Sequence, residues 1–525
     1  MAVDPNRPDE NASSPIPYKW AVLIVTIPAV MVVILDSTVV NVALAKLGAV
    51  FAVDISTVQW VITAFALALG IATPLASFLE RRYSLKRVWL LALVTFTGAS
   101  VVCGLSPAFW IMVVARLAQG VAGGVLVPMA ISSIFQAFPP NERGTALGAF
   151  AIPIVAGPAL GPTMGGYIVT YLDWRLIFFI NLPIGIGATL LAAWLLHPGR
   201  PDPSVRMDVT GTILSSIGFG CTLYGLSRVG ADGWGSLTVR GLIGVGLVVL
   251  VIFIIFELTQ PDPLLDMRLF GIPQFFFANL TGWVSTIALF GAEFMLPLYL
   301  QDLRGLTALD AGLLLLPQGL CIAVAGPIGG RLTDKIGARP VVMFGFALLT
   351  LNTWQMAHIT LDTTYTTLRW LLVARGLALG FSMQPTQVVA MSVVPPHLRT
   401  NASSVNTAMR GVFQSFGVAM LSTVVQTQSL VHSTMLSWQV TADSPQGSFL
   451  AQLVSSMQQA GMSAVQAQSV AAQELLAQIS RQGANLGFAD AYGVTFIAAI
   501  AAFCVAMLLP GRGMVHSDPA AALAG

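Results

Sequence analysis

Charged residues are scarce in this chain. Only 9% of its 525 residues are Asp, Glu, Lys or Arg, whereas 56% are hydrophobic. A soluble globular protein carries about 25% charged residues. The composition therefore excludes that class and predicts an all-α polytopic membrane protein in contact with membrane lipids. The net charge of +2 is too small to indicate a nucleic-acid partner.

Residues suited to metal or covalent chemistry are equally sparse. The four cysteines lie far apart in apolar runs, the five histidines are dispersed, and no CxxC pair occurs. This pattern argues against a disulfide framework and a zinc site. No Walker A, HExxH or GxSxG motif is present. We therefore predict no catalytic residue, no metal and no cofactor, so that active transport would draw on an ion gradient.

Long apolar runs are what the chain has in abundance. A membrane span needs about 20 largely apolar residues. After a polar tail at 1–19, fourteen runs qualify, near 20–42, 57–79, 88–106, 108–136, 145–168, 176–196, 208–228, 240–259, 274–299, 310–331, 340–358, 368–392, 401–427 and 488–509.

The distribution of basic residues predicts the orientation of these spans. Cytoplasmic connections carry more Lys and Arg than outer ones. With the N-terminus inside, the inner connections hold Arg81, Arg82, Lys86, Arg87, Arg143, Arg200, Arg206, Arg268, Arg331, Lys335, Arg339 and Arg399. Both termini, including the tail at 511–525, are therefore predicted to be cytoplasmic.

The chain also repeats itself. The segment 139–143 (PPNER) returns as 395–399 (PPHLR), and the basic turn at 77–87 returns at 330–339. Parallel repeats in a membrane protein are typical of transporters with a substrate site between the halves. We therefore expect a six-helix bundle at 20–199, two additional helices at 207–260, and a second bundle at 270–510 that includes an outer loop at 428–487.

Asp36 is the first charged residue inside a predicted span. It lies in VILDSTVVNVAL, with Asn41 nearby. Apolar surroundings disfavour an ionised carboxyl, which suits reversible protonation and makes Asp36 a candidate for proton coupling. The alternative is a structural cap that is hydrogen-bonded to a neighbouring helix.

Two further intramembrane charges are candidates for proton coupling. Glu293 occupies a position in the second half similar to that of Asp36. It could bind a proton, attract a cationic substrate or pair with an arginine, and a location near the outer surface is an alternative. Arg116 shares a helix face with Gln119 and glycines, and it returns in the repeat as Arg375. Since arginine stays charged, Arg116 would bias a nearby carboxylate, or else form a purely structural ion pair.

Polar side chains at helical spacing are candidates to line a substrate cavity. Arg410 shares a face with Asn406, and two glutamines stand beside prolines. The candidates are Asn41, Gln119, Gln318, Gln384, Asn406 and Arg410.

The segment 148–167 (GAFAIPIVAGPALGPTMGGY) is predicted to be a helix with one bare face. Gly157, Gly161 and Gly165 recur every four residues, so another helix can approach at backbone distance. Pro158 and Pro162 remove amide donors in the same turns. We interpret the segment as a hinge and packing surface that meets a helix across the interface of the halves. Ordinary helix packing is the alternative.

Several of these motifs resemble the major facilitator superfamily, in particular its fourteen-span drug:proton antiporter branch. The similar segments are LDSTVVNVAL at 35–44, RLAQGVAGG at 116–124, GPALGPTMGG at 157–166, WRLIFFINLPIG at 174–185 and GGRLTDKIGARP at 329–340. The resemblance implies the major facilitator fold with fourteen spans, proton coupling through Arg116, and an antiporter motif that includes Gly157, Pro158, Gly161, Pro162 and Gly165.

The cytoplasmic loop motif departs from the family pattern in the first half. Ser77 and Ser84 replace glycines, and Arg81 replaces an aspartate that the second half keeps as Asp334. We therefore expect the cytoplasmic charge lock to depend on Asp334 or on Glu80, with Arg339 completing the motif in the second half.

Within this branch the chain is most similar to EmrB-type pumps of Gram-negative inner membranes. The Gln- and Ala-rich segment at 451–483 predicts short amphipathic helices outside the membrane. The family implies that they dock a periplasmic adaptor connected to an outer-membrane channel. The alternative is a cap over the transporter's own mouth.

Together these observations favour proton-coupled export of hydrophobic or amphipathic small molecules across the inner membrane. A lipid or fatty-acid exporter and a nutrient importer of the same fold are alternatives. A passive channel and a membrane enzyme are less favoured, because the intramembrane charges recur with the repeat and no catalytic cluster is found.

Overall fold

The computed structural model describes residues 17–199, 201–441 and 444–509, and these residues are helical without any strand. The elements of the first half are α1 (Tyr18–Phe51), α2 (Ile55–Val58), α3 (Trp60–Ala72), η1 (Thr73–Leu75), α4 (Ala76–Tyr83), α5 (Leu85–Leu105), α6 (Phe109–Ala137), η2 (Pro140–Glu142), α7 (Arg143–Tyr171), α8 (Leu176–Phe179) and α9 (Asn181–Leu195).

The remaining elements form an intervening pair of helices and the second half. They are α10 (Val209–Asp232), α11 (Leu237–Thr259), η3 (Met267–Gly271), α12 (Pro273–Leu298), η4 (Tyr299–Leu303), α13 (Ala308–Ile336), α14 (Ala338–Met356), α15 (Tyr365–Ser392), η5 (Pro396–Leu398), α16 (Arg399–Trp438), α17 (Pro445–Gln459) and α18 (Ala464–Ala506).

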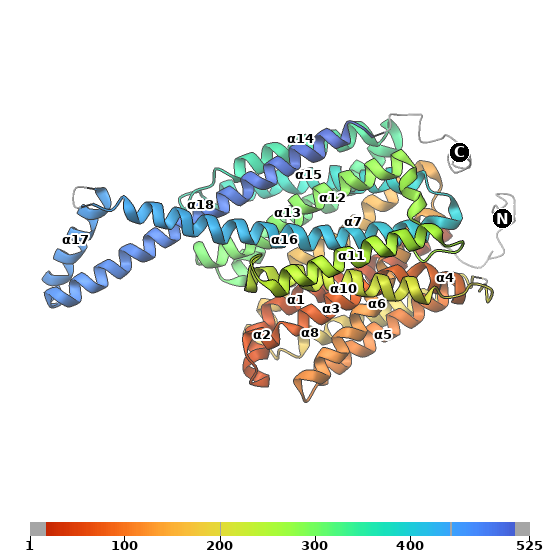
Figure 1. The fold of residues 1–525 in the computed structure, drawn as a ribbon, viewed down its shortest axis with the longest axis horizontal. Coiled ribbons are helices and arrows are strands. Elements are labelled where there is room, and N and C mark those ends of the chain that lie inside the picture. The colour runs from red at the N-terminus through yellow and green to blue at the C-terminus, as the bar shows by residue number, and fades with distance from the viewer. Residues whose placement is uncertain (1–16, 200, 442–443, 510–525) are drawn as a thin grey trace.

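Ten helices of the described chain are long and apolar enough to cross a membrane. Four more long helices, α7, α12, α14 and α15, belong to the same bundle. The all-α membrane architecture is thus confirmed, while the count of fourteen spans stays a prediction. We call the end of the bundle where α1 begins and α18 finishes the terminal end, and the opposite end the hairpin end (Figure 1).

The internal repeat is visible in the packing of the helices. In the first half α1 packs on α7 and α9, and in the second half α12 packs on α16 and α18. Likewise α3 packs on α6 as α13 packs on α15, and α5 packs on α9 as α14 packs on α18. The two proline-rich segments of the repeat both form a short 3-10 turn, η2 and η5, directly before a long helix.

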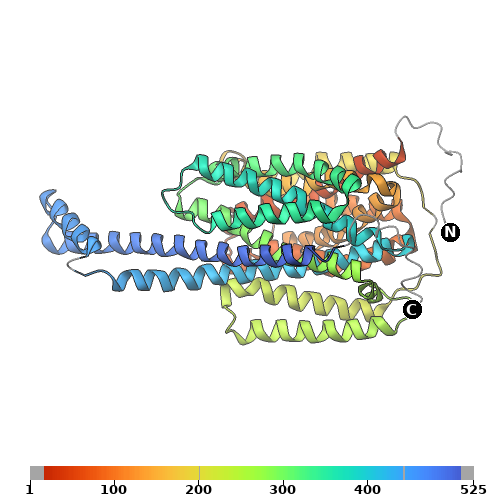
Figure 2. The same cartoon turned by 90° about the horizontal axis from the view of Figure 1, so that it is seen from above.

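The two additional helices fill a position between the halves. The helix α10 contacts α3 of the first half and α16 of the second, and α11 packs on the outer side of α10 (Figure 2). Trp60 of α3 stacks on Tyr224 of α10, and the indole of Trp234 donates a hydrogen bond of 2.9 Å to Thr423 of α16. The additional helices thus connect α3 of the first half with α16 of the second.

The helices α16 and α18 extend far beyond the bundle. With 40 and 43 residues they are about 60 Å long, roughly twice the hydrocarbon thickness of a membrane. Together with α17 they form a hairpin that points away from the bundle (Figures 1 and 2). The sequence predicts a loop with short helices here, whereas α16 and α18 continue unbroken. Gly483 and Gly487 let them stay closely packed against Ser433 and Ser429.

Candidate functional site

A buried ion pair stands at the centre of the first half. Asp36 of α1 and Arg116 of α6 are both 0% exposed, and Nη1 of Arg116 donates directly to Oδ2 of Asp36. The Nε of Arg116 donates to the carbonyl of Val61 in α3 at 2.9 Å, and the guanidinium lies 4.3 Å from the ring centre of Phe65. Both charges are therefore compensated inside an apolar environment.

This ion pair is part of a closed ring of hydrogen bonds. Gln119 accepts from Arg116 at 3.0 Å and donates to Ser100 at 2.6 Å. Asn181 donates both to Ser100 at 3.1 Å and to Oδ1 of Asp36 at 2.6 Å, which returns to the starting carboxylate. Four helices, α1, α5, α6 and α9, are joined through this ring. Two of its five hydrogen bonds end on Asp36, so a change in the charge of this carboxyl acts directly on its contacts with Arg116 and Asn181.

Ser100 and Asn181 are members of the ring that sequence reasoning missed. Ser100 lies in an apolar run and gives no signal of its own. Asn181 is part of the segment 174–185 that resembles the family, so the resemblance contained a signal for it. The position of Gln119 also differs from the expectation, because it lies in this ring instead of lining the cavity described below.

The second half contains a looser counterpart of the ion pair. Glu293 of α12 accepts a hydrogen bond of 2.8 Å from Gln318 of α13 and lies 3.9 Å from Nε of Arg375 in α15. Arg375 is buried and also donates to the carbonyl of Leu289 at 3.3 Å. The Glu293 side chain is 27% exposed, so this carboxylate is within reach of solvent or substrate. The structure thus pairs the charges that the repeat relates.

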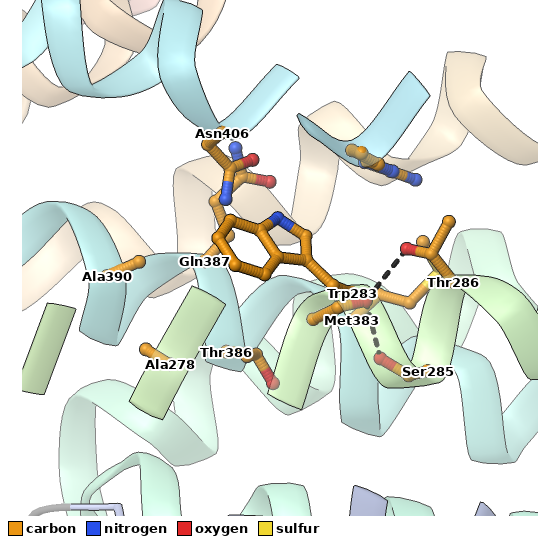
Figure 3. Close-up of a pocket in the computed structure, with 11 residues that line it drawn as sticks. Ala278, Trp283, Ser285, Thr286, Met383, Thr386, Gln387, Ala390 and Asn406 are labelled. Atoms are coloured by element: carbon orange, nitrogen blue, oxygen red, sulfur yellow. Dashed lines mark hydrogen bonds between the residues drawn. The ribbon is translucent and has the colours of Figure 1, made fainter. Parts of the chain in front are cut away.

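A small cavity lies between α12, α15 and α16 of the second half (Figure 3). Of the predicted lining residues, Asn406 and Arg410 are in it. Gln384 is buried one residue beyond the lining residue Met383, whereas Asn41 is exposed on α1. The complete lining is Ala278, Gly282, Trp283, Ser285, Thr286, Met383, Thr386, Gln387, Ala390, Asn406 and Arg410.

The cavity combines an aromatic surface with polar groups. Figure 3 shows the indole of Trp283 among the lining side chains, and its ring stacks on Phe413 with 5.2 Å between centres. Nε1 of Trp283 and Nε2 of Gln387 are buried donors without an acceptor among the described residues. In this conformation the open space is about 30 Å³, smaller than a drug-sized ligand needs, so what the lining offers is an aromatic surface with two hydrogen-bond donors. The sequence did not predict Trp283, because its context matches that of lipid-facing residues. Gln387 was also missed, although it lies only three residues after the predicted Gln384.

The glycines of α7 pack against α1. A side chain at Gly157 would collide with Ile34, and one at Gly161 with Thr38, while Gly165 faces the backbone of Val39. The expectation that this face meets a helix across the interface is therefore wrong: its partner belongs to the same half. The reason is that α7 has a second bare surface, and Gly144 and Gly148 of that surface approach Gly330 and Gly326 of α13.

The helix α7 is also continuous from Arg143 to Tyr171. The prolines of the motif do not interrupt it, so no hinge is visible there. The side chains of Pro158 and Pro162 lie outside the described part of the structure.

Two carboxylates of the loop motif connect the halves at the terminal end. Asp334 of α13 accepts from the amides of Gly144 and Thr145 and from the Thr145 hydroxyl, each at 2.9 Å, and so caps the N-terminus of α7. Glu80 of α4 accepts from Thr400, at the start of α16, at 2.5 Å. Arg339 is exposed at the start of α14. The geometry thus puts both predicted lock residues at contacts between the halves.

Further hydrogen bonds keep this end closed. Arg399 donates to the carbonyl of Phe135 at 3.1 Å, Ser403 donates to that of Pro128 at 2.9 Å, and Ser132 and Thr400 share a hydrogen bond of 2.5 Å. In the conformation described here, the two halves are therefore joined at the terminal end.

The family model of the Major Facilitator Superfamily matches residues 26–418. The chain belongs to this superfamily, whose members are membrane transporters rather than enzymes. It is 30% identical to the multidrug export protein EmrB of Escherichia coli, over 86% of this chain and 87% of that protein. It is 31% identical to the lincomycin resistance protein LmrB of Listeria innocua, over 74% and 83%.

The fold is also similar to solved transporter structures. A double tryptophan mutant of XylE superposes with a TM-score of 0.63 at 12% identity, over 97% of this chain and 98% of that structure. At this level of identity the similarity concerns the fold alone. The predicted superfamily and fold are thereby confirmed.

Proposed function

We propose that this protein exports hydrophobic or amphipathic small molecules across the bacterial inner membrane in exchange for protons. The observation that carries the proposal is the buried ring around Asp36 and Arg116. A buried carboxylate with one arginine partner can exist with or without a proton, and the two states differ in the contacts they favour. The names of the relatives EmrB and LmrB support a drug as the exported substrate.

Protonation of Asp36 would act first on the ring. A neutral carboxyl no longer attracts the guanidinium of Arg116, which stays charged and retains Gln119 and the Val61 carbonyl as acceptors. Asp36 would then release α1 from α6. Deprotonation would restore the ion pair and return α1 to the position described here.

The bare face of α7 offers a path for this movement to the interface. Ile34 and Thr38 flank Asp36 on α1 and contact Gly157 and Gly161, and Thr38 also donates to the Gly157 carbonyl at 3.1 Å. Because the glycines of α7 have no side chain that could change its rotamer at this contact, a shift of α1 displaces α7 directly. On its other surface α7 packs on α13, so the displacement reaches the second half. Alternating access would follow from this rigid connection.

The cavity beside Arg410 is the proposed substrate site. Trp283 offers an aromatic surface, and its N–H group together with the amide of Gln387 offers two donors. Glu293 would then supply a second proton site on the substrate side, since it is paired only loosely with Arg375. No cofactor is needed, because the proton gradient provides the driving force.

The hairpin of α16, α17 and α18 is the proposed docking site for a periplasmic adaptor that leads to an outer-membrane channel. Its apolar side chains include Leu430, Trp438 and Val465, which are 70%, 81% and 80% exposed. A surface of this kind suits the apolar face of a partner helix. The hairpin points away from the bundle, which favours docking over a cap on the transporter's own mouth (Figure 1). With this assignment, the terminal end and both termini face the cytoplasm.

The proposal is tested with purified protein in liposomes that contain a fluorescent drug. An imposed pH gradient should drive the drug against its concentration gradient, and a protonophore should abolish the transport. Asp36→Asn should be inactive, whereas Asp232→Asn, which alters a surface pair with Arg228, should be active. Drug transport that is independent of the pH gradient would contradict proton coupling.

Docking is tested separately in cells that express the adaptor. Trp438→Ser should abolish drug resistance and cross-linking to the adaptor while liposome transport is unchanged. If Trp438→Ser keeps both drug resistance and cross-linking, this face of the hairpin is not the docking site.

A further inference from the structure

Two acidic side chains meet inside the pair of additional helices. Asp208 caps the N-terminus of α10 and accepts from the Gly211 amide at 2.7 Å through Oδ1. Glu257, near the end of α11, is 1% exposed and accepts from the Leu265 amide at 3.2 Å through Oε2. Each carboxyl group thus uses one oxygen for a backbone contact. The second oxygen of each accepts no hydrogen bond from the described residues.

These remaining oxygens face each other. A side chain at Gly211 would collide with both Oδ2 of Asp208 and Oε1 of Glu257, so the two atoms converge on the same point beside the helix. Neither atom has a hydrogen-bond donor among the described residues. Two carboxylate oxygens are acceptors only, and in an apolar site they repel each other. A proton between them turns the repulsion into a hydrogen bond.

Among the residues that the structure describes, the surrounding charged groups do not neutralise the pair. The Arg268 guanidinium donates to the carbonyl of Gln260 at 2.8 Å, and Asp266 accepts from the Arg268 amide. Arg206 is exposed, and Arg399 of α16 donates to Phe135. On the facing part of α4, Glu80 is bonded to Thr400 and Arg81 lies 3.9 Å from Asp262. A divalent metal ion would need about six oxygen ligands, and this site offers two free ones.

Glu257 is connected to the contacts that close the terminal end. We call the segment 260–266, which follows α11, the strap. The carbonyl of Leu264 in the strap accepts from Ser77 of α4 at 3.3 Å and from Asn401 of α16 at 3.0 Å. The amide of Asp266 donates to Asn401 at 2.7 Å. The strap therefore bridges the first and second halves, and the Glu257 carboxylate fixes it to the additional helices.

We propose that Asp208 and Glu257 form a proton-binding site, separate from the transport path, that holds the strap across the two halves. With one proton shared, Glu257 stays in place and keeps its bond to the Leu265 amide. Loss of that proton puts two negative charges next to each other in a buried site, and their repulsion drives Glu257 away from the strap. The strap then loosens, and with it a connection between α4 and α16. Alkaline pH at the terminal end would in this way favour opening of that end.

The first test looks for the proton itself. Infrared spectra of the purified wild-type protein should contain the carbonyl band of a protonated carboxylic acid that disappears as pH rises and is missing in Glu257→Gln. Asp232→Asn, at the far end of α10, should keep the band. A band present in both variants, or one that responds to added Mg²⁺ or Ca²⁺ and not to pH, would overturn the proposal.

The second test follows the strap by hydrogen–deuterium exchange. After correction for the intrinsic effect of pH, the wild-type peptide that spans the strap should exchange at least several-fold faster at alkaline pH. Glu257→Gln keeps an acceptor for Leu265 and can donate to Asp208, so its strap should stay protected at every pH. Equal pH dependence in the wild type and this variant would refute the coupling. The measurement uses neither substrate nor gradient, so its result is independent of the proposed transport activity.

Discussion

Asn181 donates to the oxygen of the Asp36 carboxylate that Arg116 does not contact. Its amide nitrogen donates at 2.6 Å to Asp36 and at 3.1 Å to Ser100. A hydrogen bond to a charged group contributes about 1.5–3 kcal/mol. We predict that Asn181→Ala lowers the free energy of unfolding by this amount and strongly reduces proton-driven transport in liposomes.

Asn352 provides the matched control for this prediction. It is equally buried, and it donates to the carbonyl of Leu371 at 2.7 Å away from any charge. Asn352→Ala removes a buried hydrogen bond to a neutral carbonyl, so it should also lower the stability in a thermal melt, by less than Asn181→Ala, and yet retain transport. If both variants lose transport equally, Asn181 contributes to the stability of the protein and has no specific role in transport.

Ser84 has a backbone conformation that favours glycine. Its φ is 79° and its ψ is 149°, and the equivalent position of the second half is Gly337 with φ 92°. A non-glycine residue in this region costs about 1–3 kcal/mol. We predict that Ser84→Gly raises the thermal stability in detergent, whereas Ser84→Ala, which keeps a Cβ atom, gives no gain. An equal gain in thermal stability in both variants would contradict the claim that the backbone of Ser84 is strained.

At the scale of helices, Gly161 belongs to the close contact of α7 with α1 beside the ion pair. A leucine at this position would overlap the hydroxyl and Cβ of Thr38 and force the helices apart. We predict that Gly161→Leu reaches the membrane at normal levels but does not transport. Gly187→Leu on α9, where no atom lies within 4 Å of the added Cβ, should transport normally. Transport by Gly161→Leu would mean that the contact is ordinary packing.

The sequence predicts the helices of this fold better than their partners. The glycine spacing of α7 indicates a bare face, but two bare faces exist, and spacing alone does not assign one to α1 and the other to α13. Similarly, the apolar runs end near residues 427 and 488, whereas α16 and α18 continue. Their extension depends on packing between small residues such as Gly483 and Ser433, which hydropathy does not register.

The sequence predicts which charged residues belong together better than it predicts the polar residues around them. The repeat relates Asp36 to Glu293 and Arg116 to Arg375, and the structure pairs them as two carboxylate–arginine contacts. Ser100, Asn181 and Trp283 are common residues in apolar runs, and only the three-dimensional arrangement shows that they surround a charge or a cavity. The roles of all these residues in transport stay predictions.

For the molecule as a whole, Asp334 connects the two halves at the terminal end through three hydrogen bonds. Its three hydrogen bonds to the start of α7 require an ionised carboxylate for full strength. We predict that Asp334→Asn shifts the population towards states open at this end. Distances between spin labels on η2 and on the start of α14 should lengthen and broaden.

Asp310→Asn serves as the control, because the carboxylate of Asp310 accepts a hydrogen bond from Thr307, the cap of its own helix, at the hairpin end. It should leave the distance distribution unchanged. Normal transport together with an unchanged distribution in Asp334→Asn would contradict a lock at this residue.

The central claim is that the Asp36 carboxylate exchanges its proton in response to substrate. The most direct measurement is drug-induced proton release from the purified protein in weakly buffered detergent solution, followed with a pH indicator. The wild-type protein should release protons when the drug is added, and Asp36→Asn should still bind the drug but release markedly fewer. Undiminished proton release from a drug-binding Asp36→Asn variant would contradict the account.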